Sequence, residues 1–267
     1  MWLWALLPIC LAIFGTAGIW TVFAISVSNG SVNLTEGFPY ISECGSYNPQ
    51  SCLFAQICNI FSILALWVVV IRFQQVRDYG CHGKANIISI ILGFTSCFGV
   101  SVLGNFQQTV LRSVHLLGAF LAFFLGLGYF WMQLFLTYRA QPLKDRHWVG
   151  PVRVTICILC TVLVIVMTVL VQTDRPSPAA VCEWALVMFF FCLFGLFAAE
   201  FRHIDCHNLT PEEEQVVGVV PESERKRSLG GPLLSGTLSC AGKHLGAEGE
   251  QINPEEGRGR RGRGEAG

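Results

Sequence analysis

Six long apolar runs are the feature that most constrains the fold of this chain. They cover residues 3–27, 53–71, 87–104, 114–136, 152–171 and 181–199. Each approaches the roughly 20 residues that a helix needs to cross a bilayer. None has a charged residue in its middle, since Arg153 and Glu183 stand at run ends. Backbone N–H and C=O groups find no water inside a membrane, so runs of this length predict six transmembrane helices.

Composition supports the same fold class. Only 13% of the residues are charged, against about 25% in soluble domains, and the mean hydropathy is +0.52. We therefore predict an all-α integral membrane protein, with a six-helix bundle in residues 1–205. Residues 206–267 are rich in Gly, Glu, Pro, Ser and Arg, and this composition predicts a disordered tail. The net charge of zero gives no support to a nucleic-acid partner.

The first apolar run lacks a basic segment in front of it and exceeds the 7–15 residues usual for a signal peptide, so we expect a retained helix rather than a cleaved leader. Lys and Arg concentrate in loops on the cytosolic side of membrane proteins. The loops at 72–86 and 137–151 hold six such residues, whereas those at 28–52, 105–113 and 172–180 hold two. This difference predicts that both termini are cytosolic.

Two glycosylation triplets lie in the first predicted outer loop. They begin at Asn29 and Asn33, on the face that the charge distribution places in the lumen or outside the cell. Asn29 is very close to the first span, where the transferase has less room. Asn33 is therefore the better of the two acceptors.

The cysteines divide between the two sides of the membrane. Cys44 and Cys52 flank a short turn on the oxidising side, and a disulfide between them is one option. Pairing through Cys182 and three free thiols are the alternatives. Cys81 and Cys206 are expected at the cytosolic surface, where such cysteines can be palmitoylated.

Small residues recur at four-residue spacing in the third and fourth runs, and small residues let membrane helices approach closely. We therefore expect these two spans to pack against each other through such ridges. A general abundance of small residues in membrane helices is the alternative explanation. The ridges comprise Ser89, Gly93, Cys97 and Ser101 in one run, and Gly118, Ala122 and Gly126 in the other.

Signatures of catalysis are scarce. The chain has no G-x-S-x-G, no phosphate-binding G-x-x-x-x-G-K-[ST] and no H-E-x-x-H. Polar residues within the spans, such as Gln56, Asn59 and Gln133, are more typical of hydrogen bonds between helices than of a transport site. We predict neither an enzyme nor a cofactor or metal site.

Two short segments resemble landmarks of a known family. The first is Phe38-Pro-Tyr-Ile-Ser-Glu-Cys-Gly45, followed by Pro49-Gln-Ser-Cys-Leu-Phe54. The second is Gly104-Asn-Phe-Gln107, with His115 and Gly118-Ala119 following it. Together they are similar to the Frag/DRAM/Sfk family, which comprises the damage-regulated autophagy modulators and their transmembrane protein 150 relatives. The resemblance covers residues 1–205, although Cys44 replaces the family's usual Thr.

The resemblance implies a non-enzymatic protein of the plasma membrane and of endosomal, lysosomal and autophagosomal membranes. Such a protein would modulate macroautophagy and cell survival under stress by organising lipids or other membrane and cytosolic regulatory proteins. Some relatives assist the recruitment of a phosphatidylinositol kinase, and another is linked to mechanically evoked currents. An adaptor for such a kinase complex and a component of a mechanosensitive channel are therefore the alternatives.

Overall fold

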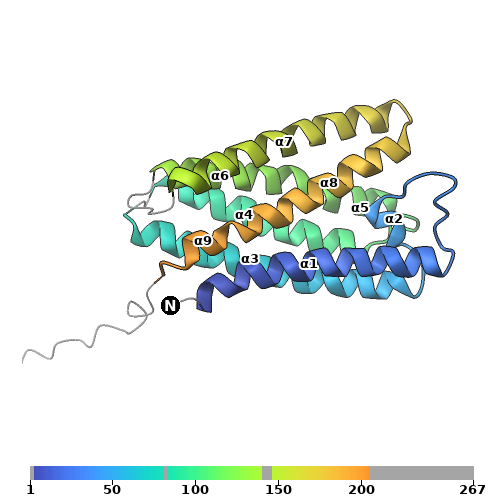
Figure 1. Ribbon diagram of the computed structural model, residues 1–267, viewed down its shortest axis with the longest axis horizontal. Coiled ribbons are helices and arrows are strands. Elements are labelled where there is room, and N and C mark those ends of the chain that lie inside the picture. The colour runs from blue at the N-terminus through green and yellow to red at the C-terminus, as the bar shows by residue number, and fades with distance from the viewer. Residues whose placement is uncertain (1–2, 81–82, 140–145, 205–267) are drawn as a thin grey trace, which may run out of the picture. The chain divides into compact units, whose positions relative to one another are not determined.

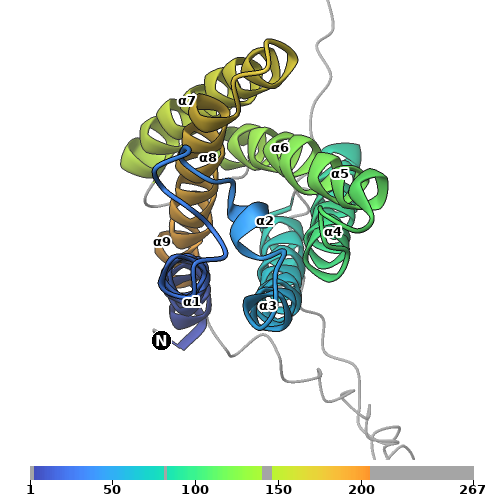
Figure 2. The ribbon, with the colours of Figure 1, turned by 90° about the vertical axis from the view of Figure 1, so that its right-hand side faces the viewer.

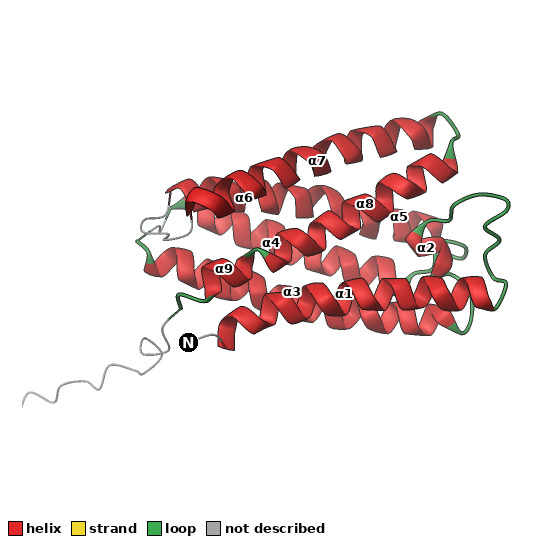
Figure 3. Cartoon of the chain, in the orientation of Figure 1, coloured by secondary structure: helices red, strands yellow, loops and turns green. Residues whose placement is uncertain are grey.

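The structure is a computed structural model that describes residues 3–80, 83–139 and 146–204. Within these ranges every regular element is helical, as Figure 3 shows. The predicted tail at 206–267 lies outside them, so the boundary at residue 205 stays a prediction. The elements are α1 (Leu3–Ser28), α2 (Ile41–Cys44), α3 (Gln50–Asp78), α4 (Lys84–Asn105), α5 (Arg112–Phe120), the π-helical η1 (Leu121–Leu125), α6 (Gly126–Arg139), α7 (Arg146–Gln172), α8 (Pro176–Gly195) and α9 (Phe197–Phe201).

All six predicted spans are confirmed as helices long and apolar enough to cross a membrane. α5, η1 and α6 together form the fourth, and α8 with α9 forms the sixth. The helices run past the ends of the apolar runs; α3, for example, continues to Asp78 rather than stopping near residue 71. Helical hydrogen bonding does not require apolar side chains, so a helix can extend beyond its hydrophobic segment.

The six spans form a closed ring. Going around it, α1 packs on α3, α3 on α4, α4 on the fourth span, α6 on α7, α7 on α8, and α8 on α1 (Figure 2). The short helix α2 lies at one end of the ring (Figures 1 and 2). We call that end, where α1 finishes and α3 begins, the cap end, and the opposite end, where α9 finishes, the tail end.

Contact between α4 and the fourth span depends on glycines. A Cβ on Gly118 would lie 2.6 Å from the Leu103 backbone nitrogen, and one on Gly99 would lie 2.6 Å from the Ala122 nitrogen. Gly93 instead lies against Val69 of α3 and Tyr129 of α6. The two spans therefore pack together, but on α4 the closest approach is at Gly99, which is outside the predicted ridge.

The remaining ridge residues contact α3 or the partner span. The Cys97 carbonyl oxygen accepts a hydrogen bond from Ser62 of α3, and Ser101 Oγ donates to Asn59 of the same helix. A Cβ on Gly126 would meet Ser96 Oγ of α4. The predicted ridge of α4 thus lies between α3 and α6: Cys97 and Ser101 bond to α3, Ser89 Oγ accepts a hydrogen bond from Gln133 of α6, and Gly93 touches both helices. Gly99 is rotated away from Gly93 around the α4 axis, toward the earlier part of the fourth span.

Large apolar side chains cover the outside of the ring. Ile13, Phe98 and Ile165 are each about three-fifths exposed, and they belong to three different spans. Polar side chains, in contrast, are buried at several points inside. An apolar exterior around a partly polar interior suits a hydrocarbon solvent. The chain is a multi-pass membrane protein.

Candidate functional site

Hydrogen bonds between the backbone of the first loop and side chains of α8 hold the loop in place. Phe38 N donates to Ser177 Oγ at 3.1 Å, and Ile41 N donates to Glu183 Oε2 at 3.0 Å. Trp184 Nε1 donates to the Pro39 carbonyl oxygen at 3.0 Å. Since proline and the first residue of a helix leave backbone groups without helical partners, side chains of α8 supply them. The Phe-Pro-Tyr-Ile segment therefore acts as the attachment point of a cap.

Aromatic packing holds the same segment. The Trp184 ring lies 5.9 Å from Phe38, 5.4 Å from Phe23 and 4.7 Å from Trp20, measured between centroids. The Phe23 and Trp184 rings meet edge to face, an arrangement that adds roughly 0.5–1.5 kcal/mol to simple burial. One tryptophan thus joins the loop, α1 and α8.

The first landmark contacts the segment between α4 and α5, directly after Gln107 of the second landmark. Ser42 Oγ donates to Gln108 Oε1 at 2.7 Å, linking α2 with the segment that follows α4. His115 Nδ1 lies 2.8 Å from the Phe106 carbonyl oxygen of that segment. Residues separated by more than 60 positions in sequence are therefore parts of one structure. Burial, with the nearby Glu183 and Glu43 carboxylates, also raises the pKa of the Tyr40 phenol.

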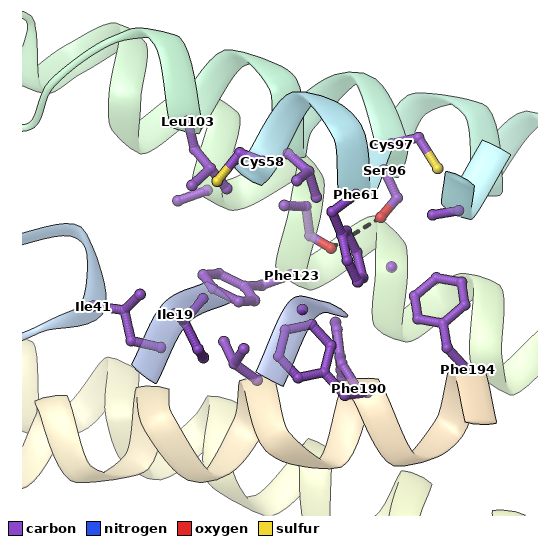
Figure 4. A pocket seen from close by; sticks show the side chains of 18 of the residues that line it. Ile19, Ile41, Cys58, Phe61, Ser96, Cys97, Leu103, Phe123, Phe190 and Phe194 are labelled. Atoms are coloured by element: carbon purple, nitrogen blue, oxygen red, sulfur yellow. Dashed lines mark hydrogen bonds between the residues drawn. The ribbon is translucent and has the colours of Figure 1, made fainter. Parts of the chain in front are cut away.

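Behind the cap, the ring encloses a cavity of about 110 Å³. Apolar side chains from several spans point into it, including Phe61 of α3, Phe123 of η1 and Phe190 of α8 (Figure 4). Ile41 of α2 also lines it, and the wall includes the carboxyl group of Glu183 and the imidazole of His115. A mostly apolar cavity with a few polar groups is the usual form of a small-molecule site.

An ionic cluster lies inside the tail end. Arg72 of α3 and Arg153 of α7 both bind the Glu200 carboxylate of α9, at 3.0 Å and 2.8 Å. All three side chains are fully buried. Gln75 Nε2 donates to the Glu200 carbonyl oxygen, and Thr137 Oγ1 donates to its carboxylate. We name Arg72, Arg153 and Glu200 the tail-end cluster; it connects three spans that are far apart in sequence.

The tail-end cluster carries two guanidinium groups for one carboxylate. The Phe197 ring lies 4.9 Å from the Arg153 guanidinium carbon and 5.9 Å from that of Arg72, so its face helps to stabilise the extra positive charge. Gln133 Oε1 accepts from Arg72 Nε. Within the described residues, Arg153 Nε has no hydrogen-bond partner.

The sequence reasoning missed this cluster. It assigned Arg72 to a loop, whereas the structure buries this residue within α3. The apolar pattern puts Glu200 just beyond the last predicted span and Arg153 at the end of an apolar run, with no role for either side chain. A signal was present, because the predicted topology puts all three at the same end of the bundle. It could not show which helices are neighbours.

The predicted cysteine sites have different outcomes. Cys44 and Cys52 are free thiols in the structure, Cys44 buried and Cys52 exposed, so it does not contain the bridge that the spacing allowed. Burial raises the pKa of the Cys44 thiol to about 11. Cys182 is also free. Cys81 and Cys206 lie outside the described residues.

The two glycosylation triplets differ in their surroundings. Asn33 is exposed on the loop, and its Oδ1 accepts hydrogen bonds from Thr35 N and Oγ1. Asn29 directly follows α1, and its amide donates to Gln50 Oε1 at 2.9 Å. The use of either site stays a prediction. No group of three His, Cys, Asp or Glu side chains suited to a metal ion occurs in the described part of the chain.

Comparison with known proteins decides the family. Residues 3–204 match the sequence model described as the Frag1/DRAM/Sfk1/Cwh43P N-terminal domain, which spans the whole described bundle. The chain belongs to this family. The resemblance of the two landmarks is therefore confirmed, and the family's matched region ends where the described residues end.

Relatives in the family are similar along most of their length. A protein of Danio rerio named modulator of macroautophagy TMEM150B is 62% identical over 214 residues, covering 80% of this chain and 92% of the relative. The Homo sapiens protein of that name is 44% identical over 202 residues, which cover 75% of this chain and 87% of the relative. Transmembrane protein 150A of Xenopus laevis is 31% identical, and the match covers 75% of this chain and 84% of the relative. No solved structure is significantly similar to the chain.

Proposed function

We propose that this chain modulates macroautophagy as a non-enzymatic membrane regulator. The observation that carries the proposal is the similarity to relatives named modulators of macroautophagy, at 62% identity over 92% of one relative's length. That similarity extends over nearly the whole relative rather than one shared segment. A common role for the entire bundle is its simplest explanation.

The regulator would act by organising other membrane or cytosolic proteins, or lipids, at plasma, endosomal, lysosomal and autophagosomal membranes, with both termini in the cytosol. Two features of the bundle support a scaffold of fixed shape. Glu183 and Trp184 fasten the cap, and Glu200 joins α3, α7 and α9. A scaffold needs such long-range links, because its surfaces must keep their relative positions to hold partners together.

Deletion of the gene followed by re-expression tests the proposal. Autophagic flux is measured as lysosome-dependent turnover of a lipidated autophagosome marker, in fed and starved cells. We expect deletion to change the flux and the full chain to restore it. A version that stops after residue 211 should restore it equally, since the family match ends at residue 204. Unchanged flux after both deletion and overexpression would contradict the proposed function.

The kinase-adaptor alternative gives a different result in the same cells. It predicts normal flux together with slower resynthesis of phosphoinositides in the plasma membrane. Following a fluorescent phosphoinositide reporter after lipid depletion therefore separates the two functions. Proximity labelling from the cytosolic C-terminus, read against organelle markers, identifies the resident membrane and neighbouring proteins.

A further inference from the structure

The cavity behind the cap is asymmetric in its chemistry. Most of its wall consists of apolar and aromatic side chains from α1, α3, α4, η1, α6 and α8. Near the cap, the polar side chains of Ser42, His115 and Glu183 also line it, and Ser96 and Tyr129 contribute polar atoms from α4 and α6. An apolar space whose one carboxyl group, that of Glu183, lies near the cap suits a molecule that is itself apolar with one polar end.

The polar end offers hydrogen-bond acceptors. Ser42 Oγ donates its hydrogen to Gln108, so toward the cavity the hydroxyl can only accept. Glu183 is buried, and its Oε2 accepts a hydrogen bond from the backbone N–H of Ile41. His115 is buried in the wall of the same cavity, with Nδ1 2.8 Å from the Phe106 carbonyl oxygen. The cavity therefore presents a carboxylate and a hydroxyl oxygen to whatever occupies it.

Glu183 has no ion-pair partner among the residues that the structure describes. In contrast, Glu200 at the tail end has two arginines. A buried carboxylate is costly unless it is paired or well hydrogen-bonded, and ionisable groups within membrane spans commonly mark functional sites. A single backbone N–H satisfies only part of this carboxylate. A donor from a ligand would satisfy the rest.

We propose that this cavity binds the amine end of an alkyl amine, with the ammonium group on Glu183 and the first carbons among Phe61, Phe123 and Phe190. The volume sets the size of the bound part. A cavity of about 150 Å³ holds benzene, so about 110 Å³ holds the head and a few carbon atoms. A free short amine and the amine end of a longer membrane amphiphile share this chemistry.

Photolabelling of the full-length protein in lipid nanodiscs tests the proposal. The probes are a short and a long diazirine alkyl amine, together with the long alkyl carboxylate of matched length. We expect the amines to label cavity residues and the carboxylate to label them at least tenfold less. Labelling by the short amine alone identifies a free small molecule as the ligand source. Labelling by both amines identifies the amine end of a longer amphiphile.

Three variants assign the label to the site. Glu183→Gln keeps an acceptor for Ile41 N but removes the charge, and it should lower amine labelling about tenfold. Val187→Phe fills the cavity wall and should abolish labelling, whereas Val181→Phe, on the exposed side of the same helix, should not. If Val187→Phe does not yield a monodisperse protein, Val100→Phe fills the opposite wall.

Two results would overturn the proposal. The first is labelling of the cavity by the carboxylate as strongly as by the amines. The second is unchanged amine labelling in a folded Glu183→Gln or cavity-filled variant. Because the readout is binding to purified protein, it is independent of any effect on autophagic flux.

Discussion

Arg153 and Glu200 form a two-point ion pair inside the bundle. Arg153 Nη1 lies 3.0 Å from Glu200 Oε1, and Nη2 lies 2.8 Å from Oε2. Paired N–H···O bonds of this kind set the orientation of both side chains as well as their distance. They therefore determine where α9 sits against α7.

Replacing Glu200 by Gln should destabilise the bundle strongly. The change leaves Arg72 and Arg153 buried without a carboxylate, and breaking a buried pair in this way costs about 3–5 kcal/mol. Thermal unfolding in detergent, followed by size-exclusion chromatography, measures the effect. Glu36→Gln is the control, because Glu36 is exposed on the first loop. Equal unfolding midpoints for Glu200→Gln and the control would show that the pair contributes little.

Gly118→Ala should also destabilise the protein, by about 1–3 kcal/mol, because the new methyl group would overlap the α4 backbone. Gly128→Ala on the same span is the matched control. Its Cβ would have only Leu92 nearby, at 3.7 Å, so we expect neutral or slightly increased stability. The unfolding midpoints of both variants check the prediction. A lower midpoint for Gly128→Ala than for Gly118→Ala would refute the close approach at Gly118.

Cys44 and Cys52 should react differently with maleimide. Cys52 is exposed and should label at pH 8, whereas Cys44 is buried and its pKa is raised to about 11. A raised thiol pKa favours the neutral form, so at pH 8 only about one Cys44 thiol in a thousand is the reactive thiolate. Labelling of Cys44 should increase as the pH approaches 11. Peptide mapping by mass spectrometry reads both sites, with Cys52→Ser as the assignment control. Protection of both thiols until reductant is added would instead demonstrate a disulfide.

Asn33→Gln should remove most of any N-linked glycan, and Asn29→Gln should remove little. Asn33 is exposed on the loop, whereas Asn29 adjoins α1 and hydrogen-bonds Gln50. The shift in gel mobility after glycosidase treatment measures each contribution. The same experiment tests the orientation, because a glycan at either position requires the cap end to face the lumen. Full-size glycan on Asn33→Gln would reverse the assignment of the acceptor.

The sequence was sufficient for the spans because length and hydrophobicity are local properties. The point of closest approach between α4 and the fourth span was harder to predict. Gly93 and Gly99 are both small, and only the rotation of α4 about its axis determines which of them faces the start of that span. The burial of Arg72 was missed for a related reason. A charged residue at the end of an apolar run is usually assigned to a loop. The burial of Arg72 instead depends on Glu200, more than 120 residues away in the sequence.

The signature segment also has a clear role only in three dimensions. In the sequence, the Phe38-Pro-Tyr-Ile segment indicates the family but not what the segment contacts. In the structure its backbone is held by Ser177, Glu183 and Trp184. Spacing within a loop contains no information about a partner helix 139 to 145 residues away, so this attachment could not be predicted.

The attachment of the first loop to α8 has a consequence for biosynthesis. Ile41 leaves the ribosome 142 residues before Glu183, its hydrogen-bond acceptor. At 5–20 residues per second, synthesis of the intervening chain takes roughly 7–30 s. During that interval the loop has no α8 to dock on. A nascent chain that stops ahead of Glu183 therefore leaves its first loop without the side chains that hold it in the finished bundle.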